Sequence, residues 1–186
     1  MSTWGLHQAQ TLARELIGTI HPRWEHLSTV GRRAENLATT RDIPEHVVAA
    51  AWVHDIGYAP QLAAPGTRFH PVDGAEHLAQ TGAPRPVVAL VAWHTGALHE
   101  ARTRGLQAHL ERLPRPDQQD LDILTLLDLT TGPTGDLVRE HDRIAEILTR
   151  YEPGHPVHTA VTASTPELLA SAARARTILD LATAMY

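Results

Sequence analysis

Apolar residues recur along most of the chain at the three- and four-residue spacing of amphipathic helices. This pattern predicts helices over residues 6–20, 24–38, 47–56, 71–80, 84–95, 101–112, 117–129 and 137–151. The alternation typical of strands is absent, as are internal repeats and linkers. We therefore predict an all-α, compact multi-helix fold, and the unequal loop lengths argue against a simple up-and-down bundle.

Capping signals and turn residues suggest where several of these helices begin and end. Asp42, with Glu45 three residues on, is a candidate cap for the helix over 47–56. Ser164 and Glu167 have the spacing of a capping box, which predicts that the last helix begins there. Residues 58–69 contain two prolines and a glycine and are predicted to form a loop.

Polar residues stand inside or at the ends of segments that are otherwise apolar. Residues 47–53 and 87–93 are apolar nearly all round, which predicts central helices, and the sequence places His54-Asp55 and His94 directly after them. An isolated buried carboxylate or imidazole is costly, but a divalent cation can neutralise a group of them. The candidate ligands are His26, His54, Asp55, His70, His94 and Asp128.

Composition narrows the class of protein. The chain has 186 residues, 42% hydrophobic and 20% charged, so we expect one folded domain. Absence of cysteine excludes a disulfide scaffold, a thiolate zinc site and a cysteine nucleophile. The net charge of −5 gives no sign of a nucleic acid partner. No signal peptide or bilayer-length apolar run is found, so we expect a cytoplasmic protein without a membrane partner; its oligomeric state stays open.

Thirteen histidines are an unusually large share for this length. With no cysteine present, histidine and aspartate ligands favour iron, manganese, cobalt, nickel or zinc over magnesium and calcium. Nine histidines fall in polar or terminal contexts and are assigned no role at the site: His7, His21, His46, His77, His99, His109, His141, His155 and His158.

The order and context of these residues resemble the HD-domain superfamily of metal-dependent phosphohydrolases. The resemblance rests on His26, the dyad His54-Asp55 and Asp128, and spans about residues 22–131. It implies a single HD domain over residues 1–186, with the helices of residues 136–186 packed on this core.

Two further segments are similar to the extra histidine motifs of binuclear HD proteins. They are residues 69–75, with His70, and residues 91–96, with His94. Such motifs occur in bacterial HD-type diadenosine tetraphosphate hydrolases and, more distantly, in HD-GYP cyclic-dinucleotide phosphodiesterases. The GYP signature itself is missing, because Gly57-Tyr58-Ala59 is displaced and has alanine in place of proline.

The resemblance implies a site with one or two divalent transition metal ions. His26, His54, Asp55 and Asp128 would hold the first metal. His70 and His94 would complete a second, with Asp55 bridging the two.

The chain also offers residues for the chemistry beside the metals. Asp55 and Asp73 are the candidate catalytic carboxylates; Asp73 acts either on a proton or by orienting His70. Arg23 lies one helical turn before His26 and can grip phosphate oxygens. Arg68 and Thr131 are further candidates for substrate binding.

These features predict a phosphohydrolase or phosphodiesterase that acts on a nucleotide-like or other small phosphorylated molecule through metal-activated hydroxide. A branch of binuclear HD proteins activates dioxygen, so a diiron oxygenase is an alternative. A non-catalytic metal or nucleotide sensor is the third possibility.

Overall fold

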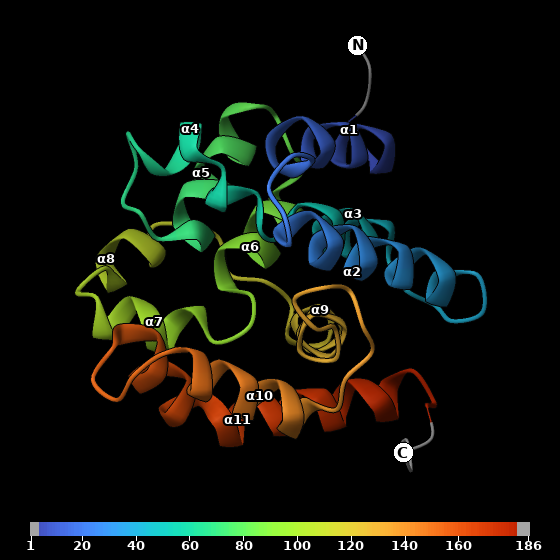
Figure 1. Ribbon diagram of the computed structural model, residues 1–186. Helices are drawn as coiled ribbons and strands as arrows, with labels where there is room; N and C mark the ends of the chain where they lie inside the picture. Colours follow the sequence, from blue (N-terminus) through green and yellow to red (C-terminus); the bar gives the residue numbers. More distant parts are fainter. Residues whose placement is uncertain (1–3, 182–186) are drawn as a thin grey trace.

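The computed structural model describes residues 4–181. It is 69% helical, and no strand occurs in the described part of the chain, which confirms the all-α prediction. Figure 1 shows the arrangement of the helices. In chain order they are α1 (Leu6–Ile17), α2 (Arg23–Ala38), α3 (Glu45–Val53), the 3-10 turn η1 (Ile56–Tyr58), α4 (Pro60–Ala63), α5 (His70–Gln80), α6 (Arg85–Trp93), α7 (Ala97–Thr103), α8 (Gln107–Leu110), α9 (Gln118–Leu129), α10 (Glu140–Arg150) and α11 (Pro156–Ile178).

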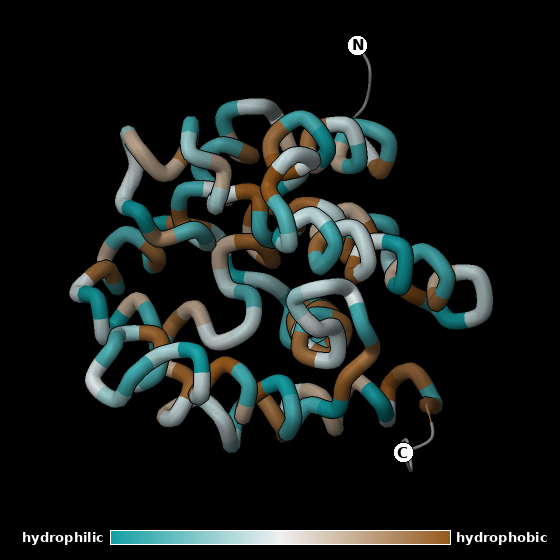
Figure 2. The backbone as a smooth tube through the Cα atoms, viewed as in Figure 1, coloured by the Kyte–Doolittle hydropathy of each residue, from teal (hydrophilic) through white to brown (hydrophobic). Residues whose placement is uncertain are grey.

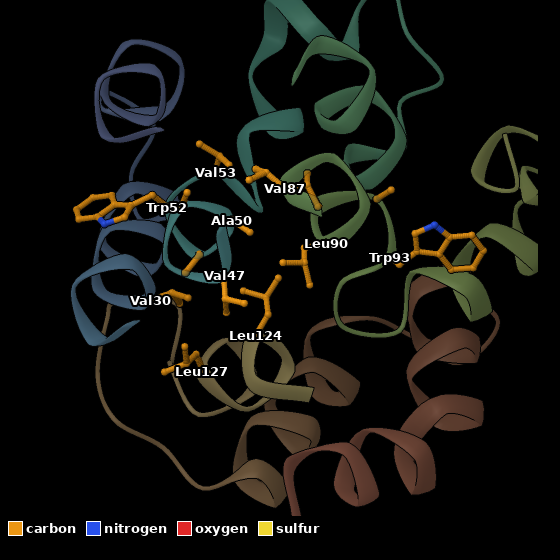
Figure 3. Close-up of a cluster of buried hydrophobic side chains, with 14 of the residues drawn as sticks. Val30, Val47, Ala50, Trp52, Val53, Val87, Leu90, Trp93, Leu124 and Leu127 are labelled. Carbon is orange, nitrogen blue, oxygen red and sulfur yellow. The ribbon is translucent and has the colours of Figure 1, made fainter. Parts of the chain in front are cut away.

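Helices α3, α6 and α9 form the centre of the core. Every residue of α3 from Val47 to Val53 is buried, and so is every residue of α6 from Val87 to Trp93. Figure 3 shows Val47, Leu90 and Leu124 meeting between the three helices. Apolar residues cover nearly all sides of α3 and α6, so the prediction that these two helices are central is confirmed.

The remaining helices cover this centre from two sides. Helices α1 and α2 pack on α3, and α5 packs on α6, whereas α11 crosses α9 and packs against it, with α10 beside α11. In Figure 2 the hydrophobic turns of α9, seen nearly end-on, lie between these two groups. The C-terminal helices thus close over one side of α9, next to the ends of α2 and α6.

Three local predictions are wrong. Helix α11 begins at Pro156, where His155 Nδ1 accepts a hydrogen bond from the Val157 amide, and Ser164 is a buried residue within it. No single helix spans residues 101–112, because Gly105, with φ of +71°, separates α7 from α8. Asp42 does not cap α3, whose N-cap position is Pro44.

The loop predicted over residues 58–69 is interrupted by the short helix α4, which begins at Pro60. Proline suits the first turn of a helix, because its fixed φ is helical and its missing amide proton would have no partner there. Within residues 4–181, no helix combines the length and the hydrophobicity needed to cross a membrane.

Candidate metal centre

The six candidate ligands come from five elements that meet on one side of the core. His26 lies in the first turn of α2 and Asp128 in the last turn of α9. His54 and Asp55 follow α3 directly, His70 begins α5, and His94 follows α6. Four of these side chains are therefore placed by the end of a helix, where the backbone changes direction and polar groups can leave the core.

His26, His54 and Asp128 form the first of two ligand clusters, with one ligand atom of each within 4.8 Å of the others. His26 Nε2 lies 3.0 Å from Asp128 Oδ1, and His54 Nε2 lies 3.9 Å from the same oxygen. All three residues are buried. Two nitrogens and one carboxylate oxygen thus face one point, as transition-metal ligands do.

Asp55, His70 and His94 form the second cluster. Asp55 Oδ1 lies 3.4 Å from His70 Nε2 and 3.6 Å from His94 Nε2. It also lies 3.8 Å from His54 Nε2, so this one oxygen is close to both clusters. The predicted bridging role of Asp55 is compatible with this position.

Backbone carbonyls fix the orientation of three of the four imidazoles. Nδ1 of His26 lies 3.1 Å from the Gly132 carbonyl oxygen, and Nδ1 of His54 lies 2.9 Å from that of Ala51. His94 Nδ1 is 2.6 Å from the oxygen of Val91. Because a carbonyl can only accept, each Nδ1 carries a proton, and Nε2 is the ring atom that each of these histidines turns toward the clusters.

A metal ion suits this donor set. His54 Nε2 is buried and has no hydrogen-bond partner among the described residues, although an unpaired buried polar atom is costly. It faces the carboxylate oxygens of Asp55 and Asp128 at distances too long for a hydrogen bond. A cation between these atoms would satisfy all three, so the residues fit a divalent transition metal.

The pKa values of two of the ligand histidines agree with this interpretation. Burial lowers the pKa of His54, and lowers that of His70 well below its usual range. Both rings are therefore neutral at neutral pH, as metal ligands must be. Burial would raise the pKa of Asp55, but the charge of Arg23 and the interactions with His54, His94 and His70 together outweigh it and hold that pKa well below its usual range.

The pKa values of His26 and Asp128 are shifted in the directions that favour an ion pair between them. Burial works against the charge on each, but the hydrogen bond between them and the opposite charges nearby together outweigh it. As a result the pKa of His26 is raised and that of Asp128 lowered. Without a metal ion, a proton shared by this pair supplies positive charge to the first cluster.

Arg23 contacts the site as the sequence suggests, but its guanidinium is already engaged. Nη1 donates to Asp55 Oδ2 at 2.8 Å, and the guanidinium carbon lies 3.7 Å from the centre of the Tyr58 ring. That ring stacks on His70, with centroids 4.0 Å apart. Arg23 thus orients the free oxygen of Asp55 toward the second cluster while remaining partly exposed beside it.

The other candidate residues lie away from the ligand clusters. Thr131 is fully buried and bonds to Arg33 and to the Leu127 carbonyl oxygen, so the structure corrects its predicted contact with substrate. Asp73 Oδ1 accepts from the amide and the hydroxyl of Thr67, which ties down the loop before α5. Arg68 is exposed in that loop, with φ of +60°. Neither Asp73 nor Arg68 lines the cavity over the clusters.

Sequence reasoning missed several residues around this cavity. Thr95 has a strained φ of +27°, and its hydroxyl donates to Asp128 Oδ2, which orients that carboxylate. Tyr58, Glu100, Arg143, Arg150 and Tyr151 also line the cavity. The sequence offered one signal for Arg143 and Arg150, because a seven-residue spacing places two arginines on the same face of a helix. Their distance in sequence from the His/Asp motifs hid the connection.

The geometry defines an all-α protein with a two-part His/Asp site suited to divalent metals. The family model named HD domain matches residues 23–131, more than half of the chain, and includes all six candidate ligands. The chain belongs to the HD domain family. No curated protein and no solved structure matches it.

Proposed function

We propose that this protein is a metal-dependent phosphohydrolase or phosphodiesterase that acts on a small, nucleotide-like phosphorylated molecule. The observation that carries the proposal is the pair of adjacent ligand clusters that share Asp55 Oδ1, next to an arginine. Two neighbouring cation sites beside a guanidinium form an arrangement suited to phosphoryl groups, which carry several negatively charged oxygens.

The ligand residues divide into two groups in this proposal. His26, His54 and Asp128 would hold one ion, and His70 and His94 would hold a second together with Asp55. Bound iron, manganese, cobalt, nickel or zinc would supply an activated water and neutralise phosphate oxygens. The buried His54 and Asp55 exclude bulk water from the inner end of the site, which strengthens the electrostatic interactions there.

In this proposal Arg23 binds the phosphate group of the substrate and orients the side chain of Asp55. Arg23 donates one hydrogen bond to Asp55, which leaves other guanidinium hydrogens available to a group bound in the cavity that Arg23 lines. Burial alone would lower the pKa of Arg23, but the charge and hydrogen bond of Asp55, together with Tyr58 and Asp128, outweigh it and raise that pKa, so the residue stays cationic at any working pH. We expect it to contact phosphate oxygens while holding Asp55 in place.

The size of the cavity supports a small substrate. The space directly over the ligand clusters is about 110 Å³, enough for one phosphate-sized group but not for a base or sugar in addition. A larger space of about 530 Å³ shares Arg23, His26 and Tyr58 with it. A phosphorylated molecule would place the reacting phosphate in the inner space and its remaining groups in the outer one.

The test is hydrolysis of mononucleotides, dinucleotides and dinucleoside polyphosphates by the metal-supplemented full-length protein. Phosphate release is measured for the mononucleotides, and chromatography of the nucleotide products is used for the other two classes. We expect activity with at least one of these, abolished in Asp55→Asn and retained in Asp142→Asn. Asp142 is a matched control, because it is an exposed acid paired with Arg139 outside the cavity. Metal content is measured in each sample.

Three outcomes would contradict the proposal. A protein that takes up no transition metal on titration would reject the metal site itself. Oxygen consumption with a phosphonate or polyol, without phosphate release, would favour an oxygenase. Tight metal binding with neither activity would favour a sensor.

A further inference from the structure

A second cavity adjoins the space over the ligand clusters and extends toward α10. It measures about 530 Å³ and is open toward the turn before α2. The two spaces have several lining residues in common, so they form one continuous path from the ligands outward. The shared residues are Arg23, His26, Tyr58, Arg143 and Arg150.

Positive charge is concentrated in this outer cavity, although the whole chain has a net charge of −5. Its lining includes three arginines and a single carboxylate, that of Glu146. Arg23 is paired with Asp55, which belongs to the inner space. Arg143 and Arg150 therefore share one carboxylate, and this pair keeps an excess positive charge.

Glu146 holds the two arginines together. Its Oε2 accepts from Arg143 Nη1 and its Oε1 accepts from Arg150, both across one turn of α10. The side chain of Arg143 is only 10% exposed, yet its one hydrogen bond within residues 4–181 is the one to Glu146. A guanidinium has five donors, so most of the donors of this nearly buried cation are left for another acceptor.

We propose that Arg143 and Arg150 form a second anion subsite, which Glu146 occupies until a further phosphate group of the substrate takes its place. The inference rests on the proposed function and deepens it: the preferred substrate carries at least two phosphate groups, as in a diphosphate or polyphosphate chain. One group lies over the ligand clusters and the next lies between the arginines.

The chemistry of the three groups favours this exchange. A phosphate offers three oxygens and more negative charge than the single carboxylate of Glu146, and arginine binds it through two parallel hydrogen bonds. Glu146 is 39% exposed and can turn toward solvent, whereas Arg143 is held by its burial. The charge of Arg143 also opposes protonation of His26, which agrees with a position close to the inner cluster.

Binding of two non-hydrolysable probes to the metal-loaded full-length protein tests the subsite. Methylphosphonate carries one anionic group, and methylenediphosphonate carries two joined by carbon. Isothermal titration calorimetry is performed after unbound metal has been removed. We expect Arg150→Gln to weaken methylenediphosphonate binding about tenfold, the equivalent of one charge-assisted contact, and to leave methylphosphonate binding unchanged.

Two more variants keep the test independent of folding. Glu146→Gln removes the competing charge, so we expect it to tighten methylenediphosphonate binding, a gain that unfolding cannot produce. Arg139→Gln is the matched control, because Arg139 precedes the same helix and pairs with Asp142 away from both cavities. It should bind both probes as the wild type does.

The subsite is rejected if Arg150→Gln and Arg143→Gln, shown by circular dichroism to be folded, bind both probes like the wild type or lose affinity for both equally. It is also rejected if Glu146→Gln weakens methylenediphosphonate binding. Failure of the proposed function is distinguishable. Substrate hydrolysis with unchanged probe binding in the variants rejects the subsite alone. Arginine-dependent binding with no hydrolysis of any substrate rejects the hydrolase alone.

Discussion

The joint between η1 and α5 determines where His70 stands, and Gly57 makes this joint possible. A Cβ atom added at Gly57 would lie 2.0 Å from the His70 carbonyl oxygen and 2.8 Å from the Gly74 nitrogen. Both neighbours are backbone atoms, which cannot turn aside as a flexible side chain can. We therefore predict that Gly57→Ala forces η1 and α5 apart.

The size of this displacement follows from the contact distance. Real Cβ contacts stay above 3.0 Å, so the two segments must separate by about 1 Å. Overpacking of this kind costs about 1–3 kcal/mol of unfolding free energy. For a chain of this length, the melting temperature should fall by roughly 2–12 °C.

The same displacement should damage one ligand cluster and spare the other. His70 Nε2 now lies 3.4 Å from Asp55 Oδ1, and metal sites tolerate changes of only about 0.2 Å in ligand position. We expect Gly57→Ala to lose the metal held by Asp55, His70 and His94. The cluster of His26 and its partners is not built on α5 and should keep its ion.

The assay combines thermal unfolding with elemental analysis of the purified variant, before and after metal titration. Gly132→Ala is the control, because its added Cβ would come no closer than 3.4 Å to Asp136 and Val138, its nearest neighbours, and so needs no backbone shift. A Gly57→Ala protein that melts with the wild type and binds the same number of ions would refute the argument.

Three further predictions concern stability and substrate contact. Burial would raise the pKa of Asp122, but its hydrogen bonds from Arg174, Ser171 and Gln118 together outweigh this and lower that pKa. The stability that Asp122 contributes is fully present above its unfolded-state pKa of 3.8 and is lost as the pH falls through its lower folded-state pKa. The free energy of unfolding measured in urea should therefore exceed that of Asp122→Asn near neutral pH, and this difference should shrink in acid. Thr131→Val, which removes a buried bond to Arg33, should lower stability by about 0.5–1.5 kcal/mol and leave KM unchanged; a raised KM would restore its role in substrate binding. Chelation should lower the melting temperature in a metal-reversible way, because ions that bind only the folded state stabilise it; an unchanged curve would argue against bound metal.

The sequence predicts the central helices and the ligand elements well because both depend on local signals. Helices α3 and α6 are apolar on every side, and a polar residue follows each of them directly. At the end of a helix the backbone changes direction, so the next side chain can point out of the apolar core and toward the ligand cluster. The all-α fold and membership of the HD domain family are confirmed on this basis.

The local sequence signals gave wrong predictions at positions whose structure depends on tertiary contacts. Ser164 and Glu167 have the spacing of a helix start, but the buried stripe of α11 begins earlier, at Ala160, and continues against α9. Packing along that stripe outweighs the capping signal. A tertiary contact also determines the place of Thr131, because its partner Arg33 lies 98 residues away in the sequence and no local pattern reveals that contact.

The two ligand clusters differ in how much of the chain must be in place before they close. Asp55, His70 and His94 lie within one continuous stretch, whereas His26 needs Asp128 and the Gly132 carbonyl, 106 residues further along. Pairing groups that are distant in sequence is slow and comes late in folding. On a growing chain, the second cluster can therefore assemble first. The first cluster appears only after α9 has been made and has docked on α2, so a filled first cluster marks a chain that has folded through α9.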